Sequence, residues 1–321
     1  MREISGLLFG LLVALTVGSS AAQTNYPDKP IRLVVSRPAG SSVDTVARLL
    51  GQKFAAAWGN PIVVDNAAGA AGNIAAERVA KAVPDGYTLG LLTQAQIVIN
   101  PSLYKLGFDP VKDFAPVSQV TVQSLMLVVH NAVPAKSVKE LVVFAKAQPG
   151  GLTYVSGGIG SVDHVAAELF KSMAGLDIRH IPYKGGTEAI PDLLGGRVTM
   201  MFSVSNVLPL AREGKLRALA VTSLRRSSAA PELPTIAESG YPGFEVTVWF
   251  GLLAPARTPA TIMSKLHLET VKALALSDFR GKLADLGLEG IGNSPNEFAA
   301  VIKSEIPKWA KVIKEAGIKP D

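Results

Sequence analysis

Two short loops combine glycines with hydroxyl-bearing residues in a pattern that can bind a small anion. The first Gly/Ser loop is Ser36-Arg37-Pro38-Ala39-Gly40-Ser41-Ser42, and the second is Ser156-Gly157-Gly158-Ile159-Gly160-Ser161. Each follows an apolar, strand-like stretch and precedes a helical pattern. A helix start carries unpaired N–H groups and the positive end of the helix dipole, so either loop could hold an anion. Alternatively, the first loop could be an ordinary helix start and the second a flexible connection.

Residue types for hydrolase or metal chemistry also occur, but without the spacing that this chemistry needs. Ser161, Asp163 and His164 are close neighbours at one expected helix start. Side chains on adjacent helical positions point about 100° apart, so these three cannot form a nucleophile–base relay. The chain has no Gly-x-Ser-x-Gly elbow, no His-x-His or His-Glu-x-x-His pattern and no cysteine. We therefore expect no enzyme activity, no metal centre and no cofactor.

The N-terminus has the features of a secretory signal peptide. Arg2 precedes an apolar run over residues 7–15, and Ser20-Ala21-Ala22 offers a cleavage site before Gln23. This pattern predicts a signal peptide over residues 1–22 and export to the periplasm, with an uncleaved N-terminal anchor as the alternative. The net charge of +6 is dispersed, which argues against nucleic-acid binding.

Strand-like and helix-like segments alternate after residue 30. We expect strands over 31–35, 62–64, 88–92, 125–129, 153–155, 178–181, 199–202, 216–221 and 246–253. Apolar stripes at helical spacing over 43–54, 138–145 and 165–173 predict helices between them. This alternation favours parallel sheets covered by helices, whose ligands bind beyond the carboxyl ends of the strands. The two strand–loop–helix units suggest two similar α/β lobes with a cleft between them.

Two further polar turns follow expected strands and could contact a ligand in that cleft. They are Thr93-Gln94-Ala95-Gln96 and Tyr183-Lys184-Gly185-Gly186. Turn formation alone would also explain the glycine pair, and glutamine pairs are common on surfaces. Both interpretations stay open for each turn.

Short motifs spread over the chain after the leader form a recognisable series. They include Tyr26-Pro27-x-Lys29-Pro30, Pro84-Asp85-Gly86-Tyr87, Pro182-Tyr183-Lys184-Gly185 and Trp249-Phe250-Gly251-Leu252. In this order they resemble the periplasmic receptors of tripartite tricarboxylate transporters, the Bug family. The resemblance implies the α/β fold of type II periplasmic binding proteins, in which two lobes joined by two hinge crossovers close over a ligand. It implies a first lobe of residues 23–124 plus 248–321 and a second lobe of residues 125–247.

The resemblance also implies that the two Gly/Ser loops form opposing jaws of a carboxylate clamp. The first jaw would contain Ala39, Gly40, Ser41 and Asp44, and the second Ser156, Gly157, Gly160, Ser161 and His164. Two alternatives stay open: Asp44 could serve only to fix its loop, and His164 could only pack against its own. Apart from the resemblance, the position of the two polar turns at strand ends makes Thr93, Gln94 and Tyr183 expected ligand contacts.

This chain departs from the family pattern at three places that bear on the ligand. Ser36-Arg37 stands where the family usually has Pro-Phe, and Arg37 could either pair with a second ligand carboxylate or point to solvent. Ser41 replaces a glycine and adds a hydroxyl donor. The segment that begins at Ser203 is about one residue shorter than expected, which alters the far wall of the pocket. We expect Arg37 and Ser203 to be ligand contacts.

By this resemblance the chain is a monomeric periplasmic receptor. It would capture a small carboxylate, such as a di- or tricarboxylate or a related organic acid, and deliver it to the membrane subunits of a transporter. A sensing module that presents the carboxylate to a membrane signalling kinase is the alternative. Hydrolysis of esters or amides is a third possibility that lacks a catalytic relay.

Overall fold

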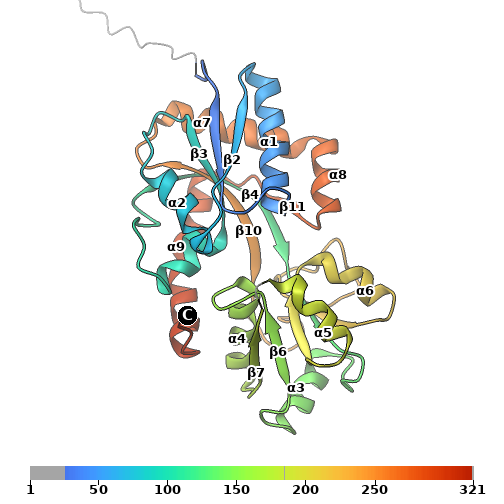
Figure 1. The fold of residues 1–321 in the computed structure, drawn as a ribbon. Helices are drawn as coiled ribbons and strands as arrows, with labels where there is room; N and C mark the ends of the chain where they lie inside the picture. Colours follow the sequence, from blue (N-terminus) through green and yellow to red (C-terminus); the bar gives the residue numbers. More distant parts are fainter. Residues whose placement is uncertain (1–25, 184, 320–321) are drawn as a thin grey trace, which may run out of the picture.

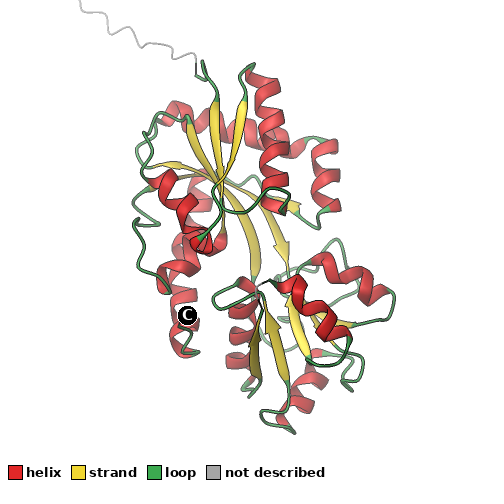
Figure 2. Cartoon of the chain, viewed as in Figure 1, coloured by secondary structure: helices red, strands yellow, loops and turns green. Residues whose placement is uncertain are grey.

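A computed structural model describes residues 26–183 and 185–319 of the chain. The expected signal peptide over residues 1–22 lies outside these residues. The described strands form two separate sheets, and each sheet is the centre of one α/β lobe (Figure 1). Helices cover both faces of each sheet (Figure 2). The two-lobed architecture expected from the alternation of segments is therefore confirmed.

The first lobe contains the six-stranded sheet, in the order β11-β4-β10-β3-β1-β2. Its strands are β1 (Ile31–Val35), β2 (Ile62–Asn66), β3 (Thr88–Thr93), β4 (Phe114–Ser124), β10 (Thr247–Pro255) and β11 (Glu289–Gly290). Its helices are α1 (Ser42–Trp58), α2 (Asn73–Ala80), α7 (Ala260–Ala275), α8 (Ser277–Asp285) and α9 (Pro295–Glu315).

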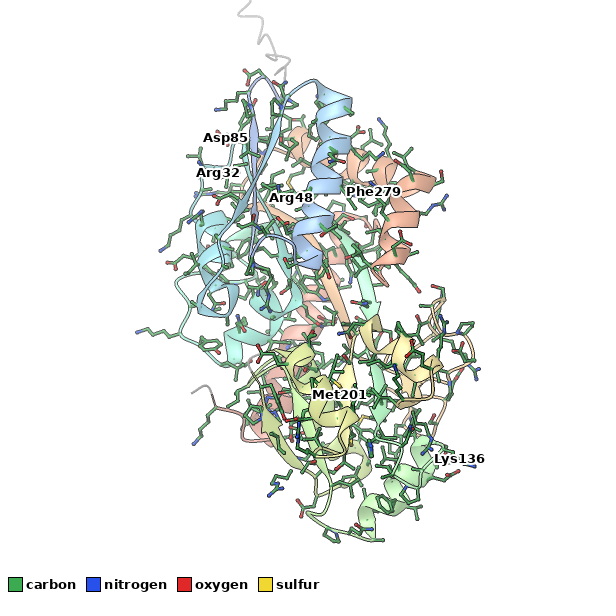
Figure 3. The ribbon with its side chains drawn as sticks, turned by 45° about the vertical axis from the view of Figure 1, so that its right-hand side comes forward. Arg32, Arg48, Asp85, Lys136, Met201 and Phe279 are labelled. Carbon is green, nitrogen blue, oxygen red and sulfur yellow. The ribbon has the colours of Figure 1, made fainter. Side chains whose placement is uncertain are left out.

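The second lobe contains the five-stranded sheet, in the order β7-β6-β8-β5-β9. Its strands are β5 (Met126–Val129), β6 (Thr153–Ser156), β7 (Arg179–Pro182), β8 (Met200–Ser203) and β9 (Arg217–Val221). Its helices are α3 (Val138–Lys146), α4 (Val162–Ala174), α5 (Ile190–Leu194) and α6 (Leu208–Arg212). Figure 3 marks Arg48 on α1 in the first lobe, and Met201 and Lys136 in the second.

Both sheets are mixed, so the expectation of parallel sheets is wrong in part. β1 runs parallel to β2 and β3, whereas β10 runs antiparallel to β3 and β4. In the second lobe β6 runs parallel to β7 and β8, whereas β5 runs antiparallel to β8 and β9. The chain enters the second lobe as β5 and returns to the first lobe as β10, and these two strands run against the βαβ strands of their sheets. β4 runs in the same direction as β3, because both are antiparallel to β10.

The two crossings lie side by side and are tied together by one threonine. Leu125 is the single residue between β4 and β5, and the return crossing leads through Val246 into β10. The Thr222 hydroxyl accepts the Leu125 N–H at 2.8 Å and donates to the Val246 carbonyl at 2.6 Å. One buried side chain thus couples both connections between the lobes.

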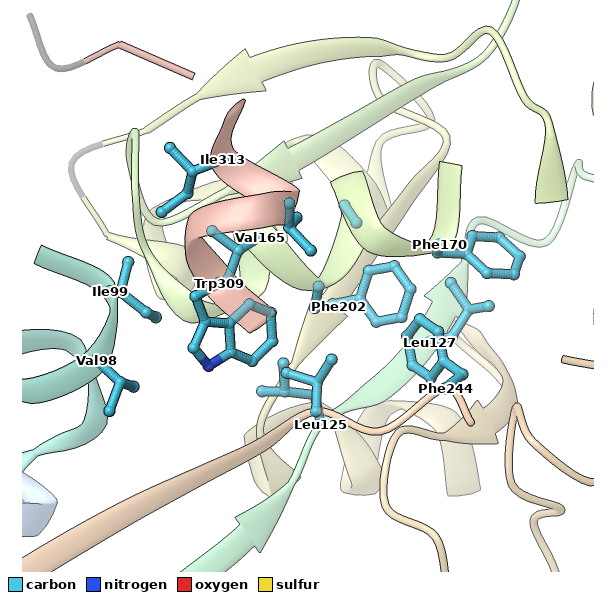
Figure 4. Close-up of a cluster of buried hydrophobic side chains, with 14 of the residues drawn as sticks. Val98, Ile99, Leu125, Leu127, Val165, Phe170, Phe202, Phe244, Trp309 and Ile313 are labelled. Atoms are coloured by element: carbon cyan, nitrogen blue, oxygen red, sulfur yellow. The ribbon is translucent and has the colours of Figure 1, made fainter. Parts of the chain in front are cut away.

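Helix α9 links the lobes a second time, away from the crossings. It packs against β4 of the first lobe and against α4 of the second. Trp309 is fully buried in a cluster that includes Ile99 from the first lobe and Val165 from α4 (Figure 4). The Glu305 carboxylate, on the same helix, accepts N–H groups from Trp249 and Gln94, each at 2.9 Å. The hydrophobic core is therefore continuous from one lobe to the other.

No helix among the described residues is long and apolar enough to cross a membrane.

Candidate functional site

A cleft of about 400 Å³ lies where the two lobes meet. The starts of α1 and α4, which follow the two Gly/Ser loops, both reach it. The first lobe contributes Arg37, Ser41, Ser42, Val43, Thr93 and Ala95. The second lobe contributes Gly157, Ser161, Val162, Asp163, Gly185, Gly186, Thr187, Phe202, Ser203, Val204 and Asn206, and the crossing segments add Leu125, Val248 and Phe250.

In the first Gly/Ser loop, Ser41 is the N-cap of α1. Its hydroxyl donates to the Pro38 carbonyl at 2.8 Å and accepts the Asp44 N–H at 3.4 Å. Gly40 has a φ of 84°, a left-handed conformation that glycine adopts without steric cost. The cap directs the first turn of α1, with Ser42 and Val43, toward the cleft.

Asp44 lies beneath this loop and does not line the cleft. Its carboxylate accepts the Gly40 N–H at 2.9 Å, the Arg48 Nε–H at 3.0 Å and the Asn66 amide at 2.9 Å. Burial by itself would raise the pKa of Asp44, but these hydrogen bonds and the Arg48 charge outweigh it and lower the pKa. In this structure Asp44 holds the loop in shape, while Ala39 and Gly40 lie outside the cleft lining.

The second Gly/Ser loop repeats this arrangement in the other lobe. The hydroxyl of Ser161, the N-cap of α4, donates to the Gly158 carbonyl at 2.6 Å. The Asp163 carboxylate accepts the Gly157 N–H at 2.6 Å, and His164 Nδ1 accepts the Gly160 N–H at 3.0 Å. Two N–H groups of the loop therefore have partners within the loop and helix. Gly157 and Ser161 line the cleft, and Gly160 does not.

A stack of aromatic rings supports the second loop from within the lobe. His180 lies between Tyr154 and His164, with ring centroids 4.7 Å from Tyr154 and 4.0 Å from His164. His180 Nε2 forms a 2.7 Å hydrogen bond with the buried Ser156 hydroxyl. Burial, together with the smaller effects of the His180 and Lys171 charges, lowers the pKa of His164 to about 3. Ser156 and His164 thus stabilise the loop as neutral groups and do not line the cleft.

The remaining residues expected at the site divide into two groups. Thr93 and Ser203 line the cleft, and the Ser203 hydroxyl donates to Asn206 at 3.0 Å. Gln94 is fully buried and donates to Glu305, and the Tyr183 hydroxyl donates to the Asp192 carboxylate. Gln94 and Tyr183 are therefore turned away from the cleft.

Two charged side chains of opposite sign lie on the cleft walls. Arg37 is exposed and lines the first-lobe wall, and its guanidinium forms no hydrogen bond or ion pair with the described residues. Asp163 lines the second-lobe wall. Asp163 is not among the expected ligand contacts, although an acidic residue in the first turn after an N-cap is a signal that could have placed it near the loop.

Comparison with known proteins agrees with this geometry. The model of the "Tripartite tricarboxylate transporter family receptor" matches residues 46–318. Protein BugT of Bordetella pertussis is 35% identical over 316 residues, covering 97% of this chain and 97% of that protein. A protein encoded in the tcbD-tcbE intergenic region of Pseudomonas sp. is 37% identical over 314 residues, covering 96% of this chain and 93% of that protein.

Solved structures with the same fold include two that carry a small carboxylate. The R. palustris protein Rpa4515 with adipate is 37% identical with a TM-score of 0.78, covering 92% of this chain and 100% of that chain. MatC from Rhodopseudomonas palustris with bound malate is 34% identical with a TM-score of 0.75, covering 90% of this chain and 100% of that chain. The periplasmic binding protein BugD is 36% identical with a TM-score of 0.75, covering 92% of this chain and all of that chain.

Proposed function

Because this chain belongs to the tripartite tricarboxylate transporter receptor family, we propose that it captures a small carboxylate between its lobes and delivers it to a membrane transporter. The family, also called Bug, consists of periplasmic solute-binding receptors rather than enzymes, so the resemblance read from the motifs is confirmed. Adipate and malate, carried by the two relatives, are both small dicarboxylates. They supply the class of ligand for this proposal.

The observation that carries the proposal is that two helix N-termini and one unpartnered guanidinium among the described residues meet at a single cleft. The first turns of α1 and α4 line it from opposite lobes, and each brings the positive end of a helix dipole. The unpartnered Arg37 guanidinium adds a full charge that can bind a carboxylate through two parallel hydrogen bonds. The cleft volume of about 400 Å³ lies within the range of small-molecule sites.

The geometry gives no support to hydrolysis. The Ser161 hydroxyl donates to a loop carbonyl, and no histidine lies within hydrogen-bonding distance of it among the described residues. His164 uses its Nδ1 to accept a backbone N–H, and burial lowers its pKa. Capture and release of a carboxylate need no proton transfer, which suits a site without a general base.

A ligand panel tests the proposal. We would measure thermal unfolding of the purified mature chain with mono-, di- and tricarboxylates, aromatic acids and acidic amino acids. A true ligand at about a hundred times its Kd should add roughly 2.7 kcal/mol of stability. Arg37→Ala should reduce the response, and Arg197→Ala, which removes a guanidinium paired with Asp192 outside the cleft, serves as a control. Absence of a response to every compound would refute the proposal.

Export and partners belong to the same proposal. We infer that residues 1–22 are removed and that the mature chain acts in the periplasm as a monomer; N-terminal sequencing and sedimentation of the native protein test both. Delivery to a transporter predicts that a strain without the gene loses uptake of the identified ligand. Intact uptake with a lost transcriptional response would instead indicate presentation to a signalling kinase.

A further inference from the structure

The Asp163 carboxylate occupies the ligand-facing side of the second Gly/Ser loop. It belongs to the first turn of α4 and lines the interlobe cleft. Its Oδ2 accepts the Gly157 N–H at 2.6 Å. The same oxygen lies beside the turn at Gly186, since a Cβ added to that glycine would be 3.7 Å from it. A carboxylate of the protein therefore already lies where an anion would approach the loop.

Asp163 differs in two respects from its counterpart in the first loop. Asp44 also accepts a glycine N–H, but it is out of the cleft and its charge is balanced by Arg48 at 3.0 Å. Asp163 forms no ion pair with any lysine, arginine or histidine in residues 26–183 and 185–319. Burial raises the pKa of Asp163 and outweighs the hydrogen bonds from the Ser161 side chain and from the backbone N–H groups of Gly157, Asp163 and His164, which act in the opposite direction. The cleft thus contains an acceptor that a ligand can satisfy.

The opposite wall carries the opposite charge. Arg37 is exposed to the same cleft, and its guanidinium has no partner among the described residues. A ligand carboxylate at this wall is attracted by Arg37, whereas one placed against Asp163 is repelled by it. A ligand with two carboxylates and no hydrogen-bond donor therefore interacts favourably with Arg37 but not with Asp163.

We propose that Asp163 determines specificity by selecting a ligand that carries, besides a carboxylate for Arg37, a hydrogen-bond donor. The donor is an ammonium or a hydroxyl group, and it binds the Asp163 carboxylate. The ligand class is therefore amino acids or hydroxy acids rather than simple dicarboxylates. This inference rests on the proposed function, because it assumes that the interlobe cleft binds a carboxylate.

The test compares ligands that share a carbon skeleton and differ in the donor. One set is adipate, ε-hydroxycaproate and ε-aminocaproate; the other is succinate, malate and aspartate. Calorimetric titration of the mature chain should show, in at least one set, a donor-bearing ligand that binds at least tenfold more tightly than the plain dicarboxylate. The amino and hydroxy members of each set identify which donor the receptor prefers.

The decisive variant is Asp163→Asn, which removes the charge and keeps an oxygen that can accept the Gly157 N–H. We expect it to reduce the tenfold preference to threefold or less. Asp278→Asn makes the same change on α8, where the carboxylate is outside the cleft and pairs with Lys53, and should leave the preference unchanged. Asp163→Ser, whose hydroxyl can also accept an N–H, carries the same test if the first variant does not fold.

The outcomes separate this inference from the proposed function. If a plain dicarboxylate binds as tightly as its donor-bearing partners in both sets, or if Asp163→Asn leaves the preference unchanged, the role of Asp163 is refuted while the receptor function stands. If none of the six compounds binds, and the wider panel of acids also gives no response, both fail.

Discussion

Gly160 brings the second Gly/Ser loop against the opposite lobe, and its replacement by alanine should disrupt this contact. An alanine Cβ at this position would lie 2.3 Å from Leu103 Cδ1, well inside van der Waals distance. Leu103 is 8% exposed and has little room to turn away. Gly160 also has a φ of 76°, where any side chain is strained.

The magnitude follows from comparing two glycines at the two ends of α4. Gly175, at the C-terminal end, has a φ of 63° with nothing within 4 Å of an added Cβ, so Gly175→Ala should cost only the left-handed strain, about 1–2 kcal/mol. Gly160→Ala carries the same strain plus overpacking against Leu103, which adds about 1–3 kcal/mol. We therefore expect Gly160→Ala to cost roughly 2–5 kcal/mol in the free energy of unfolding.

Urea unfolding of four proteins measures this effect: the parent chain, Gly160→Ala, Leu103→Ala and the double variant. Leu103→Ala removes the overlapping methyl groups, so the two substitutions should couple by about 1–3 kcal/mol. The reasoning is refuted if Gly160→Ala costs no more than Gly175→Ala. The reasoning is also refuted if the coupling energy is below about 0.5 kcal/mol, because deviations from additivity of that size are expected even for distant sites.

Three further predictions concern charged and titratable groups. Because the pKa of His164 is lowered to about 3, the unfolded chain takes up a proton before the folded one, so stability should fall by about 2 kcal/mol between pH 7 and pH 5. His164→Asn should flatten this slope in urea titrations, and an unchanged slope would contradict the prediction. Arg37→Ala should weaken binding of a diacid more than that of a matched monoacid, and equal losses by calorimetry would mean that Arg37 provides only a general field. Glu305→Ala should destabilise the fold by about 2–4 kcal/mol because two buried N–H donors lose their acceptor; Glu315→Ala, in an exposed pair, should change stability by less than about 0.5 kcal/mol.

The apolar periodicity was sufficient to predict the elements that carry the two Gly/Ser loops. The stripe through Val43, Val46 and Phe54 is the buried face of α1, and the apolar strand before each loop is observed. β4 was not expected, because Ser118, Thr121 and Gln123 interrupt its apolar pattern. These side chains are buried, and their polarity hides the strand from a search for apolar alternation.

The site was harder to predict than the fold, because the direction in which a loop side chain points depends on tertiary contacts. Ser41, Ser161 and Thr93 line the cleft, but nothing in the local sequence indicates that Gln94 turns inward to Glu305. Asp44 and Asp163 occupy similar positions after an N-cap. Only the fold distinguishes them, since Arg48 and Asn66 hold the first beneath its loop while the second faces the cleft.

The position of α9 has a consequence for the order in which the molecule can form. The second lobe is built largely from the middle of the chain, yet Val165 on α4 lies in the same buried cluster as Trp309 near the C-terminus. A growing or truncated chain without α9 leaves the apolar face of α4 open to water. The second lobe therefore cannot finish its core as an independent fragment, and folding becomes complete only when the last helix has joined the rest of the polypeptide.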